Sequence, residues 1–171
     1  MQINDIVGDC NSFVRDLLQR VRSVGIDIGN YPIDHICYRA STFEEYKEIK
    51  NKLLEISRAY VENIHHDRPI TKFILKEPLL CDGYAIPLLE LPAPKPESNF
   101  ASGLEHFEMV VGNDFEVFKE QYKNFWGGAD DSGEYNQPVY ITFDNVKTVK
   151  FHQYSLDEVL RKEGKVFIKL D

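Results

Sequence analysis

The sequence predicts an α+β fold in which two βαβββ modules form a half-barrel sheet, with an N-terminal helical cap. Strand, helix and further strands follow one another twice along the chain in the same order. The proline-rich stretch PAPKPESN separates the two runs, because it suits neither periodic structure. An amphipathic helical pattern precedes both runs. We therefore expect a cap over residues 1–30, a first module over 31–96 and a second over 97–171, within one structural domain.

The cap and the first module show clear local signals. Apolar residues recur at helical spacing over residues 9–24, and Gly25 follows as a stop. The first module opens with the β-rich run PIDHICYRA. A capping box of Thr42 and Glu45 then begins a helix over residues 42–57, which carries one apolar stripe. Punctuation by Asp, Pro and Gly separates three further strands, expected around residues 59–64, 69–75 and 83–91.

The second module repeats this order. GLEHFEMVV is a strand, and Asn113 or Asp114 caps a helix that a Gly-Gly pair ends at Gly127. QPVYITFD and KTVKFHQY are further strands. Ser155 opens a second capping box and a short C-terminal helix that runs towards Gly164. The tail KVFIKLD is extended, with no predicted place in the sheet.

Composition excludes several classes of partner. The net charge of -8 leaves no basic face for a nucleic acid backbone. No window approaches the length of a membrane span, and the N-terminus has no apolar run of the kind found in a secretory signal. Three widely separated cysteines without a CxxC pair argue against a disulfide framework. We expect a cytoplasmic protein that binds a small molecule, as a monomer or a homodimer.

Four residues at corresponding places in the two modules indicate a metal site. His35 and His106 lie in the first strand of each module, and Glu90 and His152 lie in the last. A single strand histidine is more often structural, but the repetition favours convergence on one ion. Imidazole nitrogens with a carboxylate suit one divalent cation: Zn, Fe, Mn, Ni or Co.

Charged residues near these positions suggest substrate contacts. Arg39, Arg68, Lys72 and Lys150 are candidates for pairing an anionic substrate, although each taken singly is more typical of a surface ion pair. Glu108 shares the strand face of His106 and is the candidate general base. It could equally hydrogen-bond a liganding imidazole.

Three other reactive side chains receive modest roles. His65 and His66 are neighbours on a strand and point to opposite faces, so they cannot serve one site together. We expect them to be surface or loop residues. Cys37 is a nucleophile in principle, but its strand spacing from His35 favours a small filler of the inner face.

The stretches DHICYR, NIHHDRPITKFIL, LLELPAPK, GLEHFEMV and VKFHQYSLDEV resemble the YecM-like family of the vicinal-oxygen-chelate superfamily, which includes glyoxalases, bleomycin-resistance proteins and dioxygenases. The resemblance implies a half-open barrel in each module, with a metal in the cleft between the inner faces. His35, Glu90 and His106 match the superfamily's metal ligands. Glyoxalase-like enzymes commonly place Glu at the fourth position, where this chain has His152, so their mechanism does not transfer directly.

Two functional hypotheses follow. The first is a metal-dependent enzyme of the isomerase, lyase or dioxygenase type, which acts on a small oxygen-rich anion. The second is a non-catalytic small-molecule or metal binding protein on the same fold. A third interpretation gives the inner-face histidines only a structural role.

Overall fold

A computed structural model describes residues 1–65, 67–95, 99–129 and 133–170 of the chain. Its helices are α1 (Ile3–Val7), α2 (Cys10–Ser23), α3 (Phe43–Ile56), the short 3-10 helix η1 (Gly112–Asp114), α4 (Phe115–Gln121) and α5 (Leu156–Lys162). The strands of the first half are β1 (Ile33–Arg39), β2 (Ser57–His65), β3 (Arg68–Cys81) and β4 (Tyr84–Pro92). Those of the second half are β5 (Gly103–Val110), β6 (Gly128–Ala129), β7 (Val139–Phe143), β8 (Lys147–His152) and β9 (Ile168–Lys169).

All strands join one curved sheet in the order β6-β7-β8-β5-β1-β4-β3-β2-β9. Within each half the first strand pairs in parallel with the last, β1 with β4 and β5 with β8. The halves meet where β1 and β5 pair antiparallel. This is the predicted pair of βαβββ modules in one half-barrel sheet, so the α+β fold prediction is confirmed. The predicted boundary near residues 96 and 97 lies outside the described residues.

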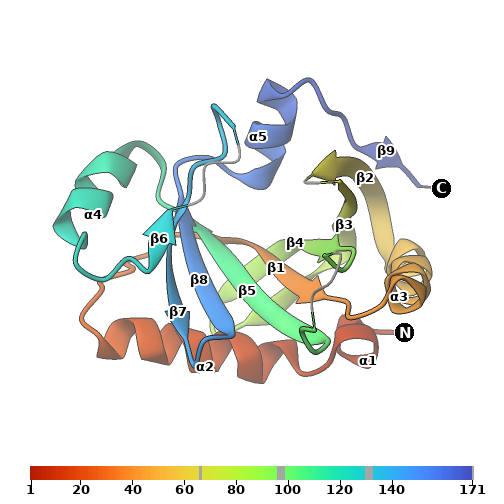
Figure 1. Cartoon of the computed structure of the whole chain (residues 1–171), viewed down its shortest axis with the longest axis horizontal. Coiled ribbons are helices and arrows are strands. Elements are labelled where there is room, and N and C mark those ends of the chain that lie inside the picture. The colour runs from red at the N-terminus through yellow and green to blue at the C-terminus, as the bar shows by residue number, and fades with distance from the viewer. Residues whose placement is uncertain (66, 96–98, 130–132, 171) are drawn as a thin grey trace.

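The core lies on one face of the sheet. Helix α2 runs along that face in Figure 1, and α5 lies on the other side. The α2 side chains that point at the sheet, such as Leu17 and Leu18, are fully buried with Phe107 and Phe151 of β5 and β8. Full burial of such a side chain stabilises the fold by about 1.5–3 kcal/mol. The opposite, inner face is therefore available for polar groups.

Both predicted N-caps, Thr42 and Ser155, are confirmed, but the capping box predicted at Thr42 is incomplete, because the Glu45 carboxylate accepts from the Ser41 backbone instead. The Thr42 hydroxyl accepts a hydrogen bond from the Glu45 backbone at 3.1 Å. The Ser155 and Glu158 side chains form a reciprocal capping box that begins α5. The capping box matters for the inner face, because α5 contributes Leu156 and Val159 to it.

Other local predictions were wrong in detail. The helix expected to reach Gly127 ends at Gln121, and Phe125 beyond it is 39% exposed. Gly128, the second residue of the Gly-Gly pair, begins β6 instead, and a Cβ at this position would overlap the Tyr140 hydroxyl. The C-terminal tail has a place after all, because β9 pairs antiparallel with β2 at the sheet edge.

Helix α1 precedes the predicted cap helix and was not expected. Its Ile6 and Val7 are buried in the core. None of the helices in the described part of the chain is long and apolar enough to span a membrane.

Candidate metal centre

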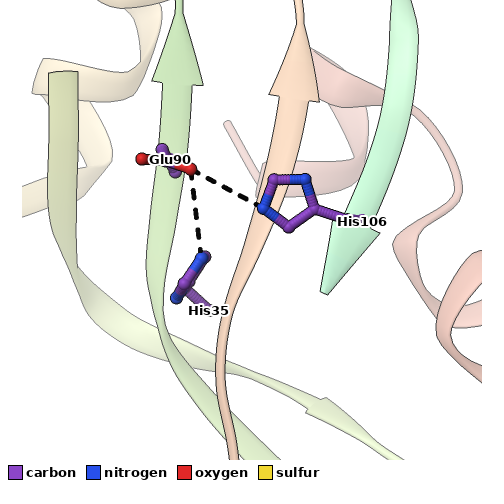
Figure 2. Close-up of side chains that lie close together, drawn as sticks. All are labelled: His35, Glu90 and His106. Carbon is purple, nitrogen blue, oxygen red and sulfur yellow. Dashed lines mark ion pairs between the residues drawn. The ribbon is translucent and has the colours of Figure 1, made fainter. Parts of the chain in front are cut away.

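Three predicted ligands meet on the inner face, one from each of three adjacent strands. His35 comes from β1, His106 from β5 and Glu90 from β4, and Figure 2 shows both imidazoles directed toward the carboxylate. Glu90 Oε2 lies 3.6 Å from His106 Nε2 and 4.0 Å from His35 Nε2. One ligand atom from each residue lies within 4.8 Å of the others. We call these residues the triad.

Strand register explains this convergence. Glu90 and His106 are both paired with Cys37, on its two sides across the sheet. Alternation along β1 then gives His35 the same face as Cys37. Each ligand is thus held by a strand in the middle of the sheet rather than by a loop.

Asp34 holds the His35 ring in position and was missed by the sequence reasoning. Its Oδ2 lies 2.9 Å from His35 Nδ1 and also accepts a hydrogen bond from the Leu156 backbone at 3.0 Å. Strict alternation assigns Asp34 to the opposite face, but the pairing of β1 with β5 is irregular between Ile33 and His35. A carboxylate on Nδ1 directs Nε2 outward, as is common for metal-binding histidines.

The two imidazoles differ in protonation. Burial lowers the pKa of His35, but the hydrogen bond that its Nδ1 donates to Asp34 and the nearby charges of Glu108, Asp34 and Glu90 raise it to about 9. Burial, with the positive charges of Lys150, His35 and Arg39, lowers the pKa of His106 well below its ordinary value. Without a metal, His35 is therefore protonated at neutral pH and His106 is neutral.

Glu90 is ionised at neutral pH in spite of its burial. Burial raises its pKa, but Lys72, His35, Lys150 and Arg68 outweigh burial and hold the pKa below its ordinary value. Lys72 Nζ lies 3.9 Å from Glu90 Oε1. An ionised carboxylate is the form that binds a divalent cation.

The donor set fits a divalent ion. Two ligand atoms bound to one ion at metal-ligand distances of about 2.1 Å lie about 3.0–3.4 Å apart, so the triad needs only small side-chain shifts. The His106 nitrogen that faces Glu90 is Nε2, the atom that would bind the ion. Two imidazoles with one carboxylate also match the facial ligand set of non-haem iron, and suit Zn, Mn, Ni or Co.

A cavity of about 400 Å³ opens over the triad. Four of the five residues predicted to contact substrate or move a proton line it: Arg39, Arg68, Lys150 and Glu108. The fifth, Lys72, pairs with Glu90 but does not line this cavity. Among the described lining residues, four side chains are Arg or Lys and three are carboxylates. The protein is acidic overall, with a net charge of -8, yet this cavity gathers positive charge. That contrast favours an anionic ligand.

The sequence model of the YecM protein family matches residues 2–147. The chain belongs to the YecM family. Protein YecM of Escherichia coli strain K12 is 26% identical over 95% of this chain and 94% of its own length. An uncharacterised protein of Haemophilus influenzae is 29% identical over 60% of this chain and 54% of its own. A solved structure described as "Structural Genomics, Protein EC4020" has a TM-score of 0.78 at 25% identity, covering 94% of this chain and 92% of that one.

In this YecM-family chain the two cavity arginines have different surroundings. Arg39 Nη1 lies 3.5 Å from Glu105 Oε1, and its guanidinium lies 4.6 Å from the Phe100 ring centre. Arg68 Nη1 donates to the Ala93 carbonyl at 2.7 Å, whereas its buried Nε has no hydrogen-bond partner among the described residues. Arg68 therefore retains a donor for a ligand.

Glu108, the predicted general base, is a buried carboxyl group at the cavity. It is 6% exposed and lines the cavity. Burial raises its pKa, although the positive charges of His35, His152 and Lys150 oppose the rise. One of its carboxylate oxygens lies within 4.8 Å of a His35 ring nitrogen.

The structure does not bring His152 to the triad. It pairs with Val110, four residues beyond His106 on β5, which is about 13 Å along a strand. Both ring nitrogens bind backbone: Nδ1 lies 2.5 Å from the Tyr154 carbonyl, and Nε2 accepts from the Gln137 amide at 3.2 Å. His152 is also not among the lining residues of the cavity.

The remaining candidates are spread around the centre. Cys37 is buried under the triad, and burial raises its pKa well above the ordinary value, so it is an unreactive thiol at neutral pH. His65, expected at the surface, lines the cavity, while His66 lies outside the described residues. Lys95 and Asn136 also line the cavity from irregular segments, where no periodic pattern could have indicated them.

Proposed function

We propose that this YecM-family protein is a divalent-metal-dependent enzyme of the isomerase or lyase type, which acts on a small oxygen-rich anion. His35, Glu90 and His106 hold the metal. The convergence of two imidazoles and a carboxylate in a cavity with cationic walls carries this proposal. Three protein ligands leave coordination positions for neighbouring oxygens of a substrate.

The residues of the chain have separate tasks in this reaction. A bound ion would supply Lewis acidity, stabilising negative charge that develops on the substrate oxygens. Arg68 and Lys150 neutralise and orient the anion. Glu108 accepts a proton from the carbon beside the polarised group, because its raised pKa brings its proton affinity closer to neutral pH. A base placed in this way favours proton transfer over a dioxygenase reaction.

Metal analysis of the purified protein tests the ligand assignment. After loading with Zn, Fe, Mn, Ni or Co in turn and removal of free ion, we expect about one ion per chain for at least one metal. H35A, E90Q and H106A should lose it. H152A is a matched control, since it removes a buried histidine from the same sheet without touching the triad, and should retain the metal. No stoichiometric metal in the wild type, or equal loss in H152A, would refute the assignment.

Proton exchange tests the enzyme hypothesis. The loaded protein is incubated in D₂O with small 2-hydroxy and 2-oxo acids, and NMR follows exchange of the proton at carbon. E108Q should slow this exchange by about 10²–10⁴-fold while leaving metal content unchanged. If anions bind to the metal-loaded protein but none of them exchanges its carbon-bound proton or is converted to a product, the protein is a binding protein and the catalytic part of the proposal fails.

A further inference from the structure

The two modules carry different charges at the same structural position. In each module, the first and last strands pair in parallel, and the residue two positions after the strand histidine faces the last strand. In the first module this pair is Cys37 with Glu90, and in the second it is Glu108 with Lys150. Lys150 therefore stands in the second module where the ligand Glu90 stands in the first.

The Lys150 side chain lies at the cavity of the metal centre. It lines the same cavity as the triad. It pairs with Glu108 on the neighbouring strand, two residues along β5 from the ligand His106. A protonated lysine has no lone pair for a metal, so this position contributes charge without coordination.

We propose that Lys150 binds an anionic group of the substrate at the coordination position that a fourth protein ligand would otherwise fill. This inference rests on the proposed function and names its substrate class: a small carboxylate with a second oxygen on the adjacent carbon, such as a 2-oxo or 2-hydroxy acid.

Charge balance supports this class. With Glu90 as the single anionic ligand, a divalent ion leaves the loaded triad with net positive charge, and Lys150 adds another positive charge beside it. A carboxylate at position 150 would instead repel an incoming anion and occupy its place. The site is thus matched to a bidentate anion that brings its own negative charge.

Calorimetry with oxalate as the probe tests the inference, because oxalate has two adjacent carboxylates. Titrations use Ni²⁺-loaded wild type, K150M, K150R and K147M. Lys147 lies on the same strand but pairs with Asp16 of α2 at 3.3 Å, on the other face of the sheet, so K147M is the matched control. Ni²⁺ affinity and melting temperature are measured on every variant first.

We expect K150M to keep its Ni²⁺ affinity within about threefold and to bind oxalate about 10–100-fold more weakly, as for loss of a charge-assisted hydrogen bond. K150R should recover most of the oxalate affinity, and K147M should match the wild type. The preference for oxalate over neutral oxamide should shrink in K150M, which a purely structural role would not produce.

K150E provides a second test, because it places a carboxylate at the position equivalent to Glu90. It should bind Ni²⁺ more tightly and lose oxalate binding. If K150M and K147M bind Ni²⁺ and oxalate equally well, the role of Lys150 is overturned while the metal proposal stands. If the wild type binds no divalent metal at all, the proposed function fails and this inference fails with it.

Discussion

Metal binding should displace a proton from His35. The pKa of this imidazole is raised to about 9, so at pH 7 only about 1% of the metal-free protein has His35 in the neutral form that can bind an ion. Freeing the nitrogen at pH 7 costs about 3 kcal/mol. The apparent metal affinity should therefore rise about tenfold for each pH unit between 7 and 8.5, and level off above pH 9.

Calorimetric titration with Ni²⁺ in buffers of different ionisation heat measures the protons released. At pH 7.5 we expect close to one proton per ion, since His106 is already neutral and releases none. D34N removes the hydrogen bond that contributes most to raising the pKa of His35. That variant should release far fewer protons at pH 8 and show a flatter pH dependence.

Two results would refute this reasoning. A metal affinity that does not change between pH 7 and pH 8.5 would mean that His35 is not protonated in the metal-free protein. Equal proton release by D34N and the wild type would mean that Asp34 does not control the His35 nitrogen.

Three further predictions concern stability. The raised pKa of His35 stabilises the metal-free protein by about 3 kcal/mol, a contribution that is fully present below pH 6.5 and is lost as pH rises through 9. Urea unfolding should therefore show a more stable protein at pH 6 than at pH 9.5. Burial raises the pKa of Glu62, but hydrogen bonds from Lys50, Thr71 and Tyr46 outweigh it and lower the pKa to about 2. E62Q should therefore destabilise the protein by about 1–2 kcal/mol at pH 7, and the difference from wild type should shrink as pH falls from 4.5 towards 2. F73A empties a fully buried site and should lower the free energy of unfolding by about 3–5 kcal/mol, against little change for an exposed substitution.

The sequence located the triad because its signals are local. Period-two alternation gave His35 and His106 the inner face, and the repeated order of elements placed Glu90 on the last strand of its module. The same local logic favoured His152, since it too lies on a last strand. Which residues of β8 stand near the triad depends on the pairing of β5 with β8, and that register places Thr148 opposite His106 and Lys150 opposite Glu108. Strand register is a tertiary property, which the alternation pattern alone does not determine.

The other differences have comparable causes. Asp34 reaches His35 through an irregularity in strand pairing, which breaks the alternation rule at one residue. Lys95 and Asn136 come to the cavity on irregular segments, whose course follows from the packing of the whole chain. The aromatic spacing that continues past α4 reflects a ring cluster, in which Trp126 packs on Phe118 after the helix has ended.

The antiparallel pairing of β1 with β5 has a mechanical consequence. His35 and Glu90 belong to one module and His106 to the other, so a coordinated ion would link the two modules where β1 pairs with β5. Neither half could then separate or unfold without releasing the ion. At a free-ion concentration one hundred times Kd, this linkage contributes about 2.7 kcal/mol. The metal-loaded protein should consequently melt in one cooperative step, and its slowest amide exchange should lie along β1 and β5.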